Sequence, residues 1–243
     1  MTQFARRLDG VRIAFDVAPG ARPVLLVHGF ASTAAATWIG TGWVRALAAT
    51  GRGSITPDLR GHGQSDRPRR AADYAPRQMA ADLVAVLDTL ELERIDVIGY
   101  SLGSRVVAAL ARLAPERMGR LVLAGAGPIE LFETWDMDQV SRFMGSDDVP
   151  YDQSIVDVLG PALPSGGDRQ ALLACVQGLA GCTLDVPAGI PQLFVAGGND
   201  PVVAGIATLA AERGADYIEL TGRTHMNALT AGEFKRVALE FLA

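Results

Sequence analysis

The sequence predicts an α/β fold in which a mostly parallel sheet carries helices on both faces. Short apolar runs alternate along the chain with longer stretches of helical periodicity, and this alternation is typical of β-α-β units. Several short runs are apolar throughout, as strands covered on both faces must be. The 243 residues are 49% hydrophobic and 20% charged, a globular composition that can form a core without disulfides or metals.

The elements of the first half follow from apolar runs with clear ends. Residues 23–27 form such a run and stop at His28, which is typical of a buried strand. Residues 77–90 carry apolar side chains at close to helical spacing, which predicts an amphipathic helix. In chain order we expect strands at 12–17, 23–27, 54–57, 95–99 and 121–124 and helices at 43–49, 77–90 and 102–113.

The alternation breaks between residues 128 and 190, where the sequence has no convincing strand. Three helical patterns, separated by glycine and proline, fill this segment: 132–144, 151–159 and 168–179. The core pattern then resumes with two strands and a helix: 192–196, 217–220 and 227–242. We therefore expect a core of residues 1–127 and 191–243 with a small helical insertion at 128–190.

Charge and composition argue against several classes of function. The net charge of −5 disfavours a nucleic-acid partner. No apolar run reaches the roughly 18 residues of a membrane helix, and the N-terminus lacks the apolar stretch of a secretory signal. We therefore expect no membrane span and a cytoplasmic location. Cys175 and Cys182 stand outside any redox motif, so they are expected to be buried thiols. Lys235 is the single lysine, and no catalytic lysine motif surrounds it.

The strongest functional signal is the pentapeptide Gly99-Tyr100-Ser101-Leu102-Gly103, which lies between an expected strand and an expected helix. Such a junction turns so sharply that its central residue takes a strained backbone conformation and its neighbours two positions away favour glycine. The turn exposes the Ser101 hydroxyl at the start of a helix, where the dipole favours negative charge. Ser101 is therefore the predicted nucleophile, and the alternative is an ordinary glycine-containing junction.

A serine needs a base, and the chain has three histidines: His28, His62 and His225. Where a Gly-x-Ser-x-Gly turn carries a nucleophile, the acid and then the histidine follow it in the chain. Only His225 follows Ser101, in a loop after the strand at 217–220.

The orienting acid is predicted to be Asp200. It lies in a glycine-rich loop after the strand at 192–196, where its carboxylate can hold the imidazole in one tautomer. Because Pro201 follows, Asp200 can also cap a helix, and the two roles are compatible.

Together these segments resemble the α/β-hydrolase superfamily, in its serine-esterase-like form with a helical cap. The resemblance rests on His28-Gly29-Phe30, the segment 58–65, the serine turn, Gly198-Asn199-Asp200 and His225. It implies that the N–H groups of Phe30 and Leu102 form an oxyanion hole. It also implies that His28 shapes the oxyanion loop and that His62 belongs to a structural turn.

The insertion at 128–190 stands where this superfamily carries its cap. An aromatic and apolar cluster in its first helix includes Trp135 and Phe143, which we expect in the substrate pocket with His28 and Met226. The alternative is that the cluster packs the helix onto the core.

The expected activity is hydrolysis of a small-molecule carboxylic ester or related acyl bond through an acyl-enzyme. No cofactor or metal is expected, because the chain has no dinucleotide fingerprint, P-loop or group of potential ligands at metal-binding spacing. The open alternatives are carbon–carbon bond hydrolysis of diketones, lactone hydrolysis, perhydrolase activity and a hydrolase-fold ligand receptor. No oligomeric state is predicted.

Overall fold

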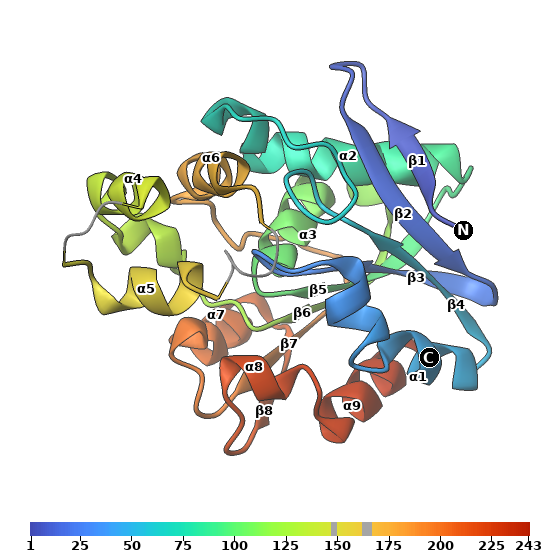
Figure 1. Ribbon diagram of the computed structural model, residues 1–243. Helices are drawn as coiled ribbons and strands as arrows, with labels where there is room; N and C mark the ends of the chain where they lie inside the picture. Colours follow the sequence, from blue (N-terminus) through green and yellow to red (C-terminus); the bar gives the residue numbers. More distant parts are fainter. Residues whose placement is uncertain (147–149, 162–166) are drawn as a thin grey trace.

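The computed structural model describes residues 1–146, 150–161 and 167–243 (Figure 1). Eight strands in these residues form one sheet in the order β1-β2-β4-β3-β5-β6-β7-β8. The pairs β1–β2 and β2–β4 are antiparallel, and every other neighbouring pair is parallel. The strands are β1 (Gln3–Arg6), β2 (Arg12–Ala18), β3 (Ala21–Val27), β4 (Arg52–Pro57), β5 (Ile95–Tyr100), β6 (Met118–Ala124), β7 (Gln192–Gly197) and β8 (Asp216–Leu220). The predicted mostly parallel sheet is confirmed.

Helices cover both faces of the sheet because the apolar strands point alternate side chains to opposite faces. In β3, Val24 and Leu26 belong to one core cluster, and Leu25 and Val27 belong to the other. On the Val24 face lie α1 (Trp43–Ala49) and α9 (Gly232–Leu242). On the other face lie α2 (Pro76–Thr89), α3 (Leu102–Leu113) and α7 (Ile206–Arg213).

The segment between β6 and β7 is helical, as expected. Its described helices are α4 (Met137–Gly145), α5 (Gln153–Leu159) and α6 (Arg169–Leu179), and they gather at one end of the molecule (Figure 1). Residues 147–149 and 162–166 of the expected insertion lie outside the described residues. The boundaries of the insertion at 128 and 190 stay a prediction.

Two predicted helices are each divided in the structure. The helix expected at 132–144 is a 3₁₀ helix, Leu131–Thr134, followed by α4. The break occurs because Trp135 is extended and the carboxylate of Asp136 accepts hydrogen bonds from the first N–H groups of α4. The helix expected at 227–242 is α8 (His225–Ala228) and then α9. The short edge strand β1 and helix α7 were not predicted.

Both cysteines are buried free thiols, which agrees with the expectation. In the described parts of the chain, no helix combines the length and apolarity that a bilayer crossing requires.

A buried ion pair joins the loop after β4 to α2. The guanidinium of Arg60 contacts both carboxylate oxygens of Asp82, at 2.5 and 2.6 Å, and both side chains are 1% exposed. Arg7 adds a second cation at 3.1 Å from the same carboxylate. Removing one member of a buried pair leaves an uncompensated charge, which costs more than the pair itself contributes.

We expect Asp82→Asn to lower the free energy of unfolding by about 3 kcal/mol, because Arg60 and Arg7 would lose their counter-charge inside the protein. Urea denaturation measures this. Glu240→Gln is the matched control, since its partner Arg236 is 58% exposed and such surface pairs contribute less than about 1 kcal/mol. Equal losses in the two variants would contradict the importance assigned to the buried pair.

Candidate active site

Ser101 lies on the tight turn between β5 and α3, with φ 53° and ψ −121°. A Cβ on Gly99 would come within 2.8 Å of the backbone of Gly103, and one on Gly103 would come within 2.1 Å of the Val27 carbonyl oxygen. Real Cβ atoms do not approach this closely, so both positions require glycine. The turn is thus packed against both α3 and the end of β3, and it leaves the Ser101 side chain at the carboxyl end of the parallel strands.

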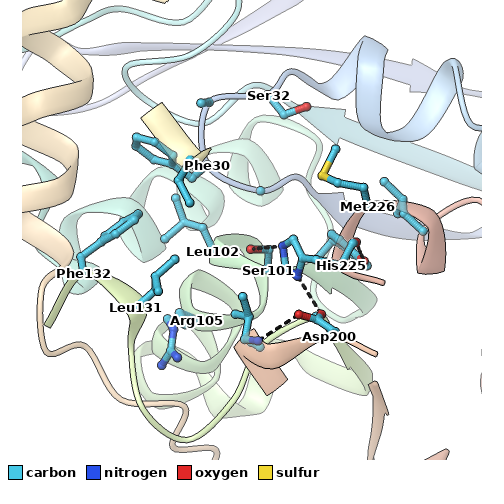
Figure 2. A pocket seen from close by; sticks show the side chains of 18 of the residues that line it. Phe30, Ser32, Ser101, Leu102, Arg105, Leu131, Phe132, Asp200, His225 and Met226 are labelled. Carbon is cyan, nitrogen blue, oxygen red and sulfur yellow. Dashed lines mark hydrogen bonds and ion pairs between the residues drawn. The ribbon is translucent and has the colours of Figure 1, made fainter. Parts of the chain in front are cut away.

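The three predicted catalytic side chains lie together at the carboxyl end of the strands (Figure 2). The Oγ atom of Ser101 lies 3.1 Å from Nε2 of His225, and Nδ1 of His225 lies 2.8 Å from Oδ2 of Asp200. Since the carboxylate accepts at Nδ1, the Nδ1–H tautomer is favoured and Nε2 is free to accept the serine proton. The Asp200 side chain is fully buried, whereas His225 is 27% exposed.

Asp200 also caps the turn that follows it. Its second oxygen, Oδ1, accepts the N–H of Val202 at 2.9 Å. The two carboxylate oxygens therefore have different partners, so the capping and orienting roles coexist. The cap fixes the carboxylate, and the carboxylate in turn fixes the plane of the imidazole.

Tyr100 also positions His225, a role that the sequence did not indicate. The hydroxyl of Tyr100 donates to the backbone carbonyl of His225, and the two rings lie 5.6 Å apart. Tyr100 is the variable residue directly before the nucleophile, and its ring also packs near Phe234 of α9. Its place in the serine motif was visible in the sequence, but no local pattern connects it to a loop 125 residues further on.

The loop that carries Phe30 is held by two histidines. Nε2 of His28 accepts the N–H of Leu59, and Nε2 of His62 accepts the N–H of Ala31, each at 3.0 Å. The Nδ1 atoms of the two rings lie 2.7 and 3.0 Å from the backbone carbonyl oxygens of Gly29 and Arg60. Both rings therefore carry their proton on Nδ1 and are neutral.

Burial favours this neutral state. It lowers the pKa of His62 to about 3, assisted by the neighbouring His28. It also lowers the pKa of His28, against the opposing effects of the Gly29 carbonyl and Asp58. Protonation at Nε2 would remove the acceptor that holds Ala31, so the neutral rings and the loop conformation depend on each other.

The two predicted oxyanion donors are unused by the protein. Among the described residues, neither the Phe30 nor the Leu102 N–H donates a hydrogen bond. Leu102 is the first residue of α3, where an N–H has no partner within the helix. Both residues line the cavity beside Ser101, so both donors remain candidates for a ligand oxygen.

A cavity of about 540 Å³ opens onto Ser101. Its lining includes the three predicted catalytic residues and Met226, which is 78% exposed. Most of the wall is apolar, with contributions from Phe30, Leu102, Ala126, Leu131, Phe132, Val158, Val202 and Leu229. The polar lining includes Ser32, Thr37, Arg105, Glu130 and Asp157.

Three of the residues predicted to line the substrate pocket do not line this cavity. His28 is fully buried because its ring nitrogens are used inside the loop. Trp135 packs behind Phe132, with ring centroids 5.0 Å apart, and belongs to the core. Phe143 packs edge-to-face on Tyr151 at 5.1 Å. Leu131 and Phe132 form the wall instead, because the chain breaks before α4 and turns Trp135 and Phe143 away from the cavity.

Comparison with known proteins identifies the family. A family model described as alpha/beta hydrolase fold matches residues 22–152, more than half of the chain. An uncharacterized protein of Mycobacterium tuberculosis (strain ATCC 25618 / H37Rv) is 38% identical over 168 residues, which are 69% of this chain and 41% of that protein. The 2-hydroxy-6-oxo-2,4-heptadienoate hydrolase of Pseudomonas putida is 34% identical over 142 residues, 58% of this chain and 50% of that enzyme. The chain thus spans half or less of the length of these curated relatives.

A solved structure, the esterase EaEST from Exiguobacterium antarcticum, has a TM-score of 0.79 at 20% identity and covers 100% of this chain and 99% of its own. At this identity the likeness concerns the fold.

The neutral histidines predict how stability depends on pH. Unfolded histidine binds a proton below pH ~6.5, whereas folded His62 stays neutral down to about pH 3. The unfolded state therefore binds more protons between these values, and the free energy of unfolding falls as pH decreases through this window, by ~1.4 kcal/mol per pH unit for this residue.

Asparagine cannot titrate, so we expect His62→Asn to lower the slope of the unfolding free energy against pH by ~1.4 kcal/mol per pH unit, the contribution of one proton. Urea denaturation at a series of pH values from about 7.5 to 4.5 measures it. Losing the hydrogen bond to Ala31 lowers the free energy of unfolding by the same amount at every pH. The comparison of the two slopes therefore does not include it. Identical slopes would show that His62 is not held neutral.

Proposed function

This chain belongs to the alpha/beta hydrolase fold family, and from that premise we propose that it is a serine hydrolase acting on a small-molecule carboxylic ester or related acyl bond. The observation that carries the proposal is the hydrogen-bonded series from Ser101 through His225 to Asp200, at 3.1 and 2.8 Å. The cavity of about 540 Å³ beside it has the size and the mostly apolar lining of a small-molecule site.

In the first step Ser101 Oγ attacks the acyl carbon while His225 Nε2 takes its proton. The imidazolium that forms is stabilised by Asp200. The negative oxygen of the tetrahedral intermediate lies between the N–H groups of Phe30 and Leu102, and each such donor contributes roughly 3 to 4 kcal/mol in other enzymes. His225 then gives the proton to the leaving alcohol, and the acyl group stays on Ser101.

In the second step water attacks the acyl-enzyme. His225 accepts a proton from the water, a second tetrahedral intermediate forms, and its collapse releases the acid and returns the proton to Ser101. The step needs a positioned base with a free Nε2, and the Asp200 hydrogen bond at Nδ1 provides that state.

The segment 128–190 acts as a cap in this proposal, with residues 1–127 and 191–243 as the core. Leu131, Phe132 and Val158 come from this segment and close one side of the cavity. A cap of this kind excludes water from the acyl group and shapes its site. We infer a preference for short to medium acyl chains, because the wall formed by Leu131 and Phe132 is apolar and the cavity of about 540 Å³ limits the length of the chain.

A second candidate is hydrolysis of a carbon–carbon bond. It is favoured by the relatives named 2-hydroxymuconate semialdehyde hydrolase and 2-hydroxy-6-oxo-2,4-heptadienoate hydrolase, each 34% identical over part of the chain. Such an enzyme prefers a vinylogous diketone to a simple aryl ester. A ligand receptor on the same fold would bind a small molecule without repeated turnover.

The test is a panel of p-nitrophenyl esters of increasing acyl length, with a vinylogous diketone in parallel. We expect Ser101→Ala to lose nearly all esterase activity, and Asp200→Asn to lower kcat by about 10⁴ because the histidine would take the wrong tautomer. Asp216→Asn is the matched control, since Asp216 is an exposed acid at the start of β8.

Each outcome separates the candidates. Faster turnover of the diketone than of every ester would favour carbon–carbon hydrolysis on the same three residues. Stabilisation by ligand without multiple turnover would favour a receptor. Equal ester hydrolysis by the native protein and Ser101→Ala would remove Ser101 as the nucleophile.

A further inference from the structure

A buried carboxyl group lines the cavity and has no part in the proposed reaction. Glu130 is 4% exposed, directly precedes the 3₁₀ helix Leu131–Thr134, and lines the same cavity as Ser101. One of its oxygens accepts the N–H of Glu133 at 3.1 Å. Within the described residues no cation lies within 4.0 Å of it. A carboxylate has about four lone-pair positions, so this group retains acceptor capacity.

Arg105 supplies positive charge near Glu130 but donates its hydrogen bonds to backbone carbonyl groups. Arg105 of α3 is 4% exposed, and its guanidinium donates to the carbonyl oxygens of Cys182, Gly127 and Ile129 at 2.9, 2.8 and 2.7 Å. Its charge acts on Glu130 through space. Three of its five N–H groups hold the chain on either side of the helices α4 to α6. Glu130 therefore remains available to a group that enters the cavity.

The position of this end of the cavity indicates which part of a substrate reaches it. Figure 2 shows Arg105, Leu131 and Phe132 on one side of Ser101, and His225 and Met226 on the other. The leaving alcohol must lie next to His225, which protonates it. The acyl group therefore points away from His225, along the apolar wall, toward the end formed by Arg105 and Glu130.

We propose that Glu130 determines specificity by selecting acyl groups that carry a hydrogen-bond donor, such as a hydroxyl, and rejecting those that carry a carboxylate. A donor on the acyl chain would satisfy the free lone pairs of Glu130, whereas an anion would face a buried negative charge. A hydroxyl is a donor without charge, so it can pair with Glu130 without bringing a second cation near Arg105. The inference rests on the proposed function, since it assumes that the acyl group occupies this side of Ser101.

The ionisation of Glu130 gives the proposal a pH signature. Burial raises its pKa to about 7, and the positive charge of Arg105 and the N–H groups of Phe132 and Glu133 oppose that increase. The other groups that act on it are the Glu133 carboxylate and the thiols of Cys175 and Cys182. Both thiols stay protonated near neutrality, because burial raises the pKa of Cys175 and raises that of Cys182 to about 12. Glu130 therefore changes charge near pH 7.

The experiment compares three series of p-nitrophenyl esters with acyl chains from hexanoyl to decanoyl. One series ends in a methyl group, one in a hydroxyl and one in a carboxylate, and kcat/KM is measured for each. Above pH 7 we expect the hydroxyl series to exceed the methyl series by roughly three- to tenfold at the best chain length. The carboxylate series should be disfavoured at least about tenfold.

The variant Glu130→Gln keeps the size of the side chain and an oxygen that can cap the 3₁₀ helix, but it removes the charge. It should bring the carboxylate series within about threefold of the methyl series. Glu133→Gln is the matched control, because this neighbouring acid is exposed and does not line the cavity. Unchanged ratios in Glu130→Gln, or equal changes in Glu133→Gln, would overturn the proposal and leave Glu130 as a helix cap.

Two further measurements test the proposal without relying on the activity of Glu130→Gln. In the native protein the rejection of the carboxylate series should weaken as pH falls through about 7, so the proposal stands or fails even where Glu130→Gln does not fold. Calorimetric titration of Ser101→Ala with the methyl esters of the same acids reports the preference without turnover. Methyl-series hydrolysis that depends on Ser101, together with ratios independent of Glu130, would reject this inference and leave the proposed function intact.

Discussion

The backbone of Ser101 imposes the constraint on which the site depends, because a non-glycine residue is held at φ 53° between a buried strand and a buried helix. Such a conformation persists only where the surroundings determine it. Gly99 and Gly103 allow the contacts, and the Ser104 hydroxyl lies 2.9 Å from the carbonyl oxygens of both Gly99 and Ala124. The turn is therefore tied to β5 and β6, and the Ser101 hydroxyl, the Leu102 N–H and the axis of α3 are set together.

A buried polar network places the other half of the site. Asp58 accepts the N–H groups of Ala34 and Gln64, and His28 and His62 each accept one further backbone N–H. Every one of these bonds links the loop after β3 to the loop after β4 or closes one of them. Satisfied polar groups in a low-dielectric interior specify one arrangement, since any alternative leaves a buried group unpaired. The direction of the Phe30 N–H is thus determined by residues that do not touch a substrate.

The sequence predicted what local patterns encode. Apolar runs and helical periodicity predicted the parallel sheet, which the structure confirms, and the spacing of the motifs selected Ser101, Asp200 and His225, whose catalytic roles stay proposals. The residues of the cavity wall could not be predicted. The periodicity of the segment from 132 to 144 indicates an apolar face, but it does not show which of these side chains face the cavity and which pack into the core. Asp136 caps the start of a separate helix, α4, and the extended Trp135 before it lies in the core. The Tyr100 hydroxyl was missed because its partner is distant in sequence.

Helix α3 contacts both the nucleophile and the segment that forms the far wall of the cavity. Helix α3 begins directly after Ser101, and one turn later Arg105 holds Gly127 and Ile129, which lead into Glu130, and Cys182, which follows α6. Three N–H groups of this buried guanidinium donate to carbonyl oxygens, and breaking one of these bonds would leave a buried donor unpaired. Helix α3 therefore links Ser101 to the segment that leads into Glu130. This link through α3 is the physical basis of our proposal that Glu130 selects the polarity of an acyl group bound to Ser101.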